Sequence, residues 1–261
     1  MSQTNPVLRT ETDIYQSLAL IYDALMQDIN YEYWSDFIDA VIQTHHPDAE
    51  TVLELACGTG SFALSLDELA CYDIMATDQS GKMIEVAKNK ASAIPNNVFF
   101  QQMDFTNISI TETFDIVLML FDSINYMLKD DDIVKVFNQV KQLLNPVGFF
   151  IFDFTTPSNS EKAEKLLNEK GVSENGYEFE RISRYDKSEG IHYNEFVIEK
   201  IKEDPNSAPE RYHELHKQRV YTLPHMIDII GKSELKIVAK YDALDIFEAD
   251  ENSDRITMVL R

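Results

Sequence analysis

An apolar segment that runs into a glycine turn is the most informative chemistry-bearing feature of the sequence. Residues 52–55 read as a buried strand, and the turn 57–60 (Cys-Gly-Thr-Gly) opens a helix near Ser61. Gly58 and Gly60 lack the Cβ that would block close approach of a ligand to the backbone. The first N–H groups of the helix are free and point at whatever lies over the turn. The pattern predicts the binding loop of a nucleotide-type cofactor.

Glu54, within that strand, discriminates between cofactors. A carboxylate at the strand end repels a dinucleotide pyrophosphate and attracts the ammonium and sulfonium groups of S-adenosylmethionine. The string 58–63 (Gly-Thr-Gly-Ser-Phe-Ala) also fits the looser G-x-G-x-x-A dinucleotide pattern. The glycines alone therefore leave both cofactors open, and the context has to decide.

Two further strand ends carry acids. Asp78 ends the predicted strand 72–77, where a carboxylate can accept from both ribose hydroxyls. Asp104 follows the strand 98–102 and can accept from the adenine amine, while Phe105 and Met83 cover the faces of the base. Each acid alone is compatible with a helix N-cap or a solvated turn. Three acids at three successive strand ends favour an adenosine that carries an amino-acid tail.

In these motifs and their order the chain resembles the class I, Rossmann-like S-adenosylmethionine-dependent methyltransferases. The resemblance spans nearly the whole chain. The matching segments are 52–60, 76–80 with Met83, 102–105 and 114–126.

The N-terminal segment narrows the resemblance. Tyr15, Tyr22-Asp23 and Trp34 resemble the opening of a bacterial subgroup of small-molecule methyltransferases, related to sugar-amine and glycine N-methyltransferases. Ala56 departs from the family's fullest motif, which has a glycine there. We expect only slightly less room beside the methionyl tail.

The resemblance implies S-adenosylmethionine as cofactor and in-line transfer of its methyl group to an N or O nucleophile of a small molecule. The acceptor must lose a proton, and Asp122, at the end of the fourth strand, is the nearest candidate base. For the aromatic residues, core packing is the alternative role. The expected cofactor-binding residues are Tyr15, Tyr22, Glu54, Ala56, Gly58, Gly60, Asp78, Gln79, Met83, Asp104, Phe105 and Leu120, and the expected substrate-binding residues are Trp34, Asn125, Tyr126, Arg219 and Tyr221.

A histidine pair and a basic–aromatic pair lie together near residue 216. His213 and His216 have a spacing seen in metal sites, but on a strand an i, i+3 pair points to opposite faces, so we expect no metal. Arg219 and Tyr221 share a face. They are expected to bind an acceptor carboxylate, with an ordinary cross-strand salt bridge as the alternative.

Alternating strands and helices must position these residues. Five strands are predicted near 52, 73, 98, 115 and 149, with helices near 61, 80 and 131 and a short polar stretch over 106–113. This alternation predicts a doubly wound parallel sheet with a ligand crevice at the strand carboxyl ends. Residues 235–241 and 255–260 should finish it as the antiparallel hairpin typical of the family.

Two segments stand outside that alternation. Residues 1–46 are expected to form a helical lid, with helices over 14–26 and 31–42. Residues 155–222 read as a helix through Leu167 followed by strands 177–185, 191–202 and 211–222. We expect an inserted antiparallel layer that covers the acceptor site within one domain spanning 1–261. A dimerisation or merely structural sheet is the alternative.

The composition limits the kinds of partner and compartment that we expect for this protein. A chain of 261 residues with 44% hydrophobic content can bury one large core, and it has no apolar run of membrane-spanning length. Its polar start predicts no signal peptide. With 23 basic and 45 acidic residues the net charge is −22, which disfavours nucleic acid. Cys57 and Cys71 suit a reducing compartment, so a cytoplasmic protein is expected. We expect it to be a monomer or a homodimer.

Other function classes remain open at this stage. An RNA- or tRNA-modifying methyltransferase would need a basic patch. An NAD-dependent oxidoreductase would use the same glycine loop, but it would have to tolerate Glu54 and leave Asp104 unexplained. A non-catalytic adenosyl-binding protein would keep the acids and lack an acceptor cavity.

Overall fold

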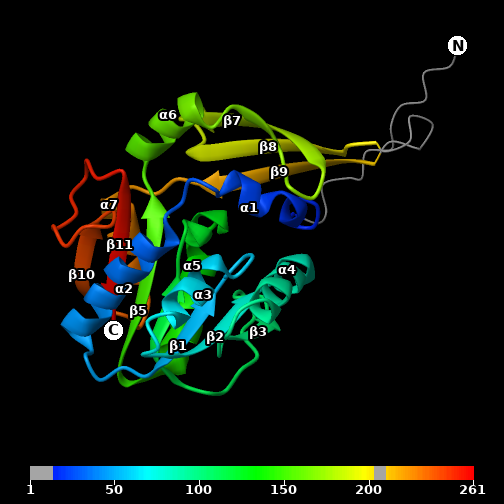
Figure 1. The fold of residues 1–261 in the computed structure, drawn as a ribbon. Coiled ribbons are helices and arrows are strands. Elements are labelled where there is room, and N and C mark those ends of the chain that lie inside the picture. Colours follow the sequence, from blue (N-terminus) through cyan, green and yellow to red (C-terminus); the bar gives the residue numbers. More distant parts are fainter. Residues whose placement is uncertain (1–13, 203–209) are drawn as a thin grey trace, which may run out of the picture.

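Two β-sheets organise the computed structural model, which describes residues 14–202 and 210–261 (Figure 1). The larger sheet has seven strands in the order β10-β11-β5-β4-β1-β2-β3. Strands β1 to β5 are parallel, β11 is antiparallel to β5, and β10 is antiparallel to β11. The Rossmann-like sheet with its C-terminal hairpin is thus confirmed. Its strands are β1 (Thr51–Leu55), β2 (Asp73–Asp78), β3 (Phe99–Gln102), β4 (Phe114–Met119), β5 (Leu144–Thr155), β10 (Ile237–Asp242) and β11 (Arg255–Leu260).

Helices cover both faces of this sheet, so its central strands are continuous apolar runs rather than alternating ones. One core lies under α5 (Asp130–Leu143) and α7 (Leu223–Gly231). The other lies under α2 (Tyr31–His45), α3 (Ser61–Asp67) and α4 (Gly81–Ser92). The helices predicted near 31, 61, 80 and 131 are confirmed. Helix α7 was not predicted.

The segment 155–222, here called the inserted layer, forms the second sheet. Helix α6 (Pro157–Leu166) precedes an antiparallel sheet in the order β6-β7-β8-β9. The three predicted strands are confirmed, and β6 is additional. In Figure 1 this sheet lies beyond the end of the large sheet to which the strand carboxyl ends point. Its strands are β6 (Glu169–Val172), β7 (Tyr177–Asp186), β8 (Ile191–Lys200) and β9 (Arg211–Arg219).

The N-terminal segment lies between the two sheets (Figure 1). It contains a short 3-10 helix, η1 (Leu18–Leu20), and one turn of α-helix, α1 (Tyr22–Leu25). The single helix predicted over 14–26 is therefore wrong, because Ile21 has a non-helical backbone and separates the two turns. Leu18 and Ile21 pack against Phe179 and Phe196 of the inserted layer. Residues 1–13 of the expected lid lie outside the described residues.

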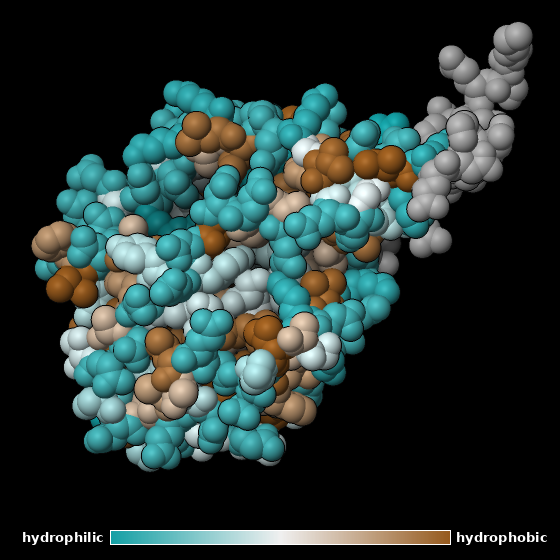
Figure 2. Space-filling view, viewed as in Figure 1, coloured by the Kyte–Doolittle hydropathy of each residue, from teal (hydrophilic) through white to brown (hydrophobic). Residues whose placement is uncertain are grey.

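The surface agrees with the acidic composition. Hydrophilic side chains predominate on the face shown in Figure 2, and hydrophobic side chains form small separate clusters there. Within the described residues, no helix is both long and apolar enough to cross a membrane.

Candidate active site

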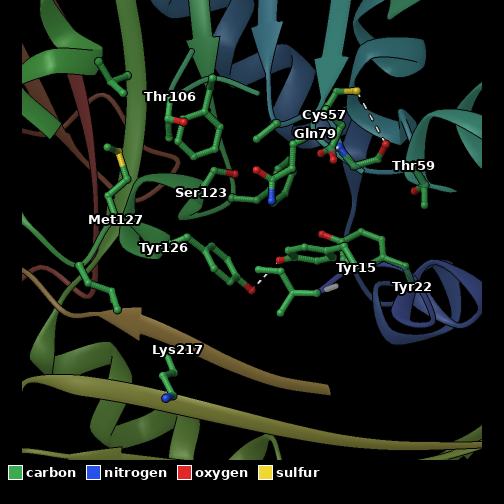
Figure 3. A pocket seen from close by; sticks show the side chains of 18 of the residues that line it. Tyr15, Tyr22, Cys57, Thr59, Gln79, Thr106, Ser123, Tyr126, Met127 and Lys217 are labelled. Carbon is green, nitrogen blue, oxygen red and sulfur yellow. Dashed lines mark hydrogen bonds between the residues drawn. The ribbon is translucent and has the colours of Figure 1, made fainter. Parts of the chain in front are cut away.

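A cavity of about 820 Å³ lies at the carboxyl ends of β1, β2 and β4 (Figure 3). The glycine loop after β1, the end of β2 and the loop after β4 form its walls together with the N-terminal segment. Strand β9 contributes Lys217 from the opposite side. This is the crevice in which open parallel sheets bind ligands. The predicted cofactor residues among its walls are Tyr15, Tyr22, Ala56, Gly58, Asp78, Gln79 and Phe105.

The two glycines of the loop have different reasons to be glycine. Gly58, with φ +55°, lines the cavity, and a Cβ there would lie 3.6 Å from the Tyr22 ring. Gly60, with φ +75°, does not line it. A Cβ at Gly60 would lie 2.6 Å from the Phe100 ring and 2.9 Å from Ala87. The bare Cα of Gly60 thus allows the start of α3 to pack against β3 and α4, and the expected contact of Gly60 with the cofactor stays a prediction.

Asp78 braces the glycine loop from the end of β2. Its two carboxylate oxygens accept from Gly58 N at 2.9 Å and Ser80 N at 2.8 Å. Burial raises the pKa of Asp78, although both amide bonds oppose that shift. Each bonded oxygen keeps a second lone pair, so the carboxylate can still accept from ligand hydroxyls in the cavity.

Glu54 lies beneath the loop and does not line the cavity. It is 2% exposed, and its Oε2 atom has no hydrogen-bond partner among the described residues. Burial, followed by the charge of Asp78, raises the pKa of Glu54 to about 8. An unpartnered buried carboxyl is costly, and a nearby positive charge relieves that cost. The site thus fits a ligand with ammonium and sulfonium groups, as S-adenosylmethionine has.

Lys90, from α4, ties the N-terminal segment to the glycine loop. Its ammonium group lies 2.9 Å from Asp23 of α1, 3.0 Å from Thr59 Oγ1 and 2.7 Å from Ser61 Oγ. This contact fixes α1 over the cavity. Sequence reasoning missed it because Lys90 reads as an ordinary solvated residue at a helix end.

Besides Glu54 and Gly60, three further predicted cofactor residues do not line the cavity. Asp104 Oδ1 accepts from the backbone and the hydroxyl of Thr106, both at 2.8 Å, so its carboxylate closes a local turn. Met83 and Leu120 are 1% exposed and pack in the interior. The expected contacts of these three residues with the cofactor stay predictions.

A second cavity of about 300 Å³ adjoins the first. Tyr15, Tyr22, Phe121 and Tyr126 line both cavities. Trp34 lines the second, with its ring centroid 4.3 Å from that of Phe121. Sequence reasoning missed several of its polar residues. The sequence carried a signal for Arg181, because the alternating strand pattern puts this charged residue on the same face of β7 as Tyr177 and Phe179. The missed residues are Arg181, His192, Asn194, Gln218 and Arg255.

Asp122 faces this second cavity, and each of its two oxygens accepts a hydrogen bond. Oδ1 accepts from Arg255 Nη2 at 2.7 Å, and Oδ2 accepts from Gln218 Nε2 at 2.5 Å. Arg255 also binds buried Asp153, whose pKa is raised to about 6, chiefly by burial. The two bonds from Arg255 and Gln218 fix the orientation of the Asp122 carboxylate. The geometry supports a positioning role for Asp122, and its expected role as general base stays a prediction.

Three expected substrate-binding residues line neither cavity. Asn125 is buried and donates to Arg219 O at 2.7 Å. The Arg219 side chain pairs with Asp130 at 2.8 Å, and Tyr221 donates to Met127 O. Asn125, Arg219 and Tyr221 fasten β9 and the loop after β4 to α5, and their expected role in substrate binding stays a prediction. The salt-bridge alternative for Arg219 is right, with a partner on a helix.

Cys57 fills the turn as a small buried residue. Burial, with the charges of Glu54 and Asp78, raises the pKa of its thiol well above the usual value. Among the described residues, no group of three His, Cys, Asp or Glu side chains is arranged to hold a metal ion.

Comparisons with known proteins agree with this geometry. Residues 52–148 match the methyltransferase domain family. A putative methyltransferase of Bacillus subtilis, YqeM, is 29% identical over 80% of this chain and 81% of its own. An N,N-dimethyltransferase of dTDP-4-amino-2,3,4,6-tetradeoxy-D-glucose from Saccharopolyspora spinosa is 24% identical over 64% of this chain and 71% of its own.

The fold comparison extends over almost the entire chain. The crystal structure of an S-adenosylmethionine-dependent methyltransferase from Clostridium acetobutylicum is 25% identical, with a TM-score of 0.75 over 95% of this chain and 99% of that one. The chain thus contains a methyltransferase domain over residues 52–148, and its fold is that of S-adenosylmethionine-dependent methyltransferases. Its cofactor is S-adenosylmethionine.

Proposed function

We propose that the protein methylates an amine nitrogen of a small polar molecule held in the second cavity. The observation that carries this proposal is the shared wall: Tyr15, Tyr22, Phe121 and Tyr126 border both cavities. A cofactor in the larger cavity and an acceptor in the smaller one would therefore meet at these side chains. When bound, S-adenosylmethionine supplies an electrophilic methyl group.

The size and lining of the second cavity support a small acceptor. A volume of about 300 Å³ lies at the lower end of small-molecule sites, and it suits one monosaccharide or amino acid rather than a macromolecule. Trp34 and Phe196 offer apolar surface, while Asn194 and Arg181 of the inserted layer offer polar groups. We therefore infer that the inserted layer covers the acceptor and that the N-terminal segment acts as its lid.

An amine is favoured over a hydroxyl. A neutral amine attacks before it loses its proton, whereas an alcohol needs a base during attack. The carboxylate among the cavity walls, Asp122, has both oxygens engaged. The amino-sugar N,N-dimethyltransferase relative supports the same choice. Residues at the shared wall align the nucleophile and exclude water from it. Such alignment lowers the activation free energy by about 7 kcal/mol or more in favourable cases.

Charge disfavours the RNA alternative. The net charge of −22 opposes a phosphate backbone, and counterion release favours nucleic-acid binding only where basic groups gather. A gel shift with tRNA at low salt is the most permissive check. We expect no sub-micromolar complex, and such a complex would reopen the RNA-modifying alternative.

Release of S-adenosylhomocysteine is the measurement that tests the proposed function. A panel should pair amino sugars, their nucleotide conjugates and amino acids with the matching hydroxyl compounds. We expect turnover on at least one amine and none on its hydroxyl counterpart. Turnover on hydroxyl compounds alone, or on tRNA alone, contradicts the proposal. Titration with S-adenosylmethionine and NAD, where only the first should bind, checks cofactor choice independently.

The acceptor cavity has a matched pair of test residues on α2. Trp34 lines the second cavity, whereas Tyr33 is 54% exposed on the same helix. Trp34→Ala should raise the acceptor KM at least tenfold and leave S-adenosylmethionine affinity within twofold. Tyr33→Ala should change neither. An unchanged KM in Trp34→Ala would move the acceptor elsewhere.

A further inference from the structure

A buried chain of hydrogen bonds leads away from the wall that the two cavities share. The Tyr15 hydroxyl donates to the Tyr126 hydroxyl at 2.5 Å, a contact drawn in Figure 3. The Tyr126 hydroxyl lies 3.0 Å from His216 Nδ1, and His216 Nε2 lies 2.9 Å from Glu214 Oε2. The His216 and Glu214 side chains are 1% and 5% exposed. Four side chains from three separate segments thus form one line.

Glu214 fixes the direction of this chain. Its carboxylate also accepts from the backbone N–H groups of Tyr15, Ser17 and Leu18, at 2.7, 2.7 and 3.0 Å. Burial alone would raise the pKa of Glu214, but the bonds from His216, Ser17 and these amides lower it to about 2. The group is therefore ionised at neutral pH and only accepts hydrogen bonds.

The tautomer of His216 follows from this. Because Glu214 only accepts, His216 Nε2 must carry a hydrogen. In the neutral imidazole Nδ1 is then bare, and it accepts the Tyr126 hydroxyl proton. Tyr126 in turn accepts from Tyr15, so every hydrogen bond in the line points from the cavities toward His216. In this tautomer the line ends at His216 Nδ1, whose lone pair faces the Tyr126 hydroxyl.

The open end of the line lies where the proposed reaction would occur. Tyr15 and Tyr126 are among the walls of both cavities, whereas His216 is not. The backbone of Tyr15 is held on both sides: its N–H donates to Glu214 and its carbonyl accepts from Ser80 Oγ at 2.9 Å. Its φ of +66° is unusual for a residue with a side chain, and these contacts hold it there. The ring is thus fixed between the cavities.

We propose that Tyr15, Tyr126, His216 and Glu214 form a proton relay that removes the acceptor proton after methyl transfer, an inference that rests on the proposed function. The amine lone pair first forms the nitrogen–methyl bond while the sulfur–methyl bond of the donor would break and leave its electron pair on sulfur, so that the nitrogen becomes positively charged. Its N–H bond then breaks, and the electron pair stays on nitrogen. The proton passes to the Tyr15 oxygen, the Tyr15 proton to Tyr126, and the Tyr126 proton to His216 Nδ1.

The product state is a neutral methylated amine and an imidazolium beside the Glu214 carboxylate. Tyr15 contacts the acceptor, His216 is the terminal proton acceptor, and Glu214 is a positioning residue. The other charged groups that face the line are Asp122, after β4, and Arg181, on β7. The Phe196 ring closes the side of His216, with centroids 5.3 Å apart.

The tautomer can be tested without any acceptor. In the full chain labelled with ¹⁵N-histidine, NMR at neutral pH should show His216 with a protonated Nε2 and a bare Nδ1. Tyr126→Phe should shift the Nδ1 resonance, because it removes the hydroxyl and keeps the ring. A protonated Nδ1 at neutral pH would overturn the relay whether or not the proposed function holds.

Kinetics test the proton transfer itself, on the amine that turns over fastest in the panel. His216→Ala should lower kcat at least 100-fold, abolish the acidic limb of the kcat–pH profile and respond to added imidazole. The dissociation constant for S-adenosylhomocysteine should stay within twofold. His213→Ala is the matched control, since His213 is on the same strand and pairs with Glu195 at 2.6 Å.

The control should leave kcat and its pH profile unchanged. A His216→Ala protein that keeps the wild-type pH profile would overturn the relay while leaving the proposed function intact. If that variant does not fold, Tyr126→Phe supplies the same kinetic test with the packing retained. Should no amine turn over, the proposed function fails, and the histidine resonances still decide the state of the relay.

Discussion

Arg255 Nη2 donates to Asp122 Oδ1 at 2.7 Å and thereby joins β11 to the turn after β4. The same guanidinium binds Asp153 of β5, which is fully buried, and lies over the Trp34 ring at 5.7 Å. One arginine therefore connects two strands, the turn and the wall of the second cavity. Removal of one partner leaves the others buried with incomplete bonding, which is costly.

Asp122→Asn should therefore lower the stability of the fold and leave proton transfer from the acceptor unchanged. We expect the free energy of unfolding in urea to fall by about 1–3 kcal/mol, because a neutral amide binds the guanidinium less strongly. The acidic limb of the kcat–pH profile should remain. Asp130→Asn, which weakens the more exposed pair with Arg219, should cost less than about 1 kcal/mol. Loss of the acidic limb in Asp122→Asn would restore Asp122 as the base.

Glu54 makes cofactor affinity depend on pH. Its pKa of about 8 leaves it mainly protonated at neutral pH in the free protein. A cationic ligand favours the carboxylate, so binding releases a proton and tightens as pH rises from about 6 to 8, by up to about tenfold per pH unit. Calorimetry in buffers of different ionisation enthalpy measures this proton release. Glu54→Gln should abolish it, and a pH-independent affinity in the wild type would contradict the assignment.

The same pKa has a consequence for stability. The folded-state pKa of Glu54 is raised above its ordinary value of 4.5. The native protein then holds a proton that the unfolded chain has lost, so this group lowers the free energy of unfolding as pH rises through the window from 4.5 to 8. Bound cofactor should offset that loss.

Asp78 should be essential for cofactor affinity. Asp78→Ala removes the acceptor for ribose hydroxyls and the brace on Gly58, and bonds to a charged group contribute about 1.5–3 kcal/mol each. Calorimetric titration with S-adenosylmethionine should show at least tenfold weaker binding. Asp73→Ala, at the exposed opposite end of β2, should bind as the wild type does. Equal affinities for the two variants would remove Asp78 from the ribose site.

Ala56 occupies a backbone conformation that favours glycine. Its φ is +57°, and a left-handed conformation costs an L-residue roughly 1–2 kcal/mol. A glycine removes this cost. It also raises the conformational entropy of the unfolded chain, which lowers the free energy of unfolding by about 0.4–1 kcal/mol. Ala56→Gly should thus raise the free energy of unfolding by up to about 1 kcal/mol, measured in urea. Gly58→Ala, at φ +55°, is the reverse change and should lower it. A destabilised Ala56→Gly would show that the methyl group packs favourably.

Local rules predicted most of the framework. The continuous apolar strands of the large sheet, the alternating burial on β7 and the Ser80 cap of α4 each follow from neighbours within a few residues. The broken turn at Ile21 did not follow. Its helical period is present in the sequence, but burial against the inserted layer and the amide bonds to Glu214 override it. Strand β6 and helix α7 were not predicted for a related reason, because their formation depends on packing partners far along the chain.

The sequence by itself determined the cofactor loop and the class of cofactor. A glycine turn after a buried strand favours few backbone paths, and Asp78 at the end of the neighbouring parallel strand necessarily lies at the same edge of the sheet. Only the tertiary structure decided which side chains face the acceptor. Asp122 is bound by residues 96 and 133 positions away, and Glu214 reaches Tyr15 across 199. Such partners are selected by burial and hydrogen-bond geometry after the sheets have packed, and no local pattern in the chain records them.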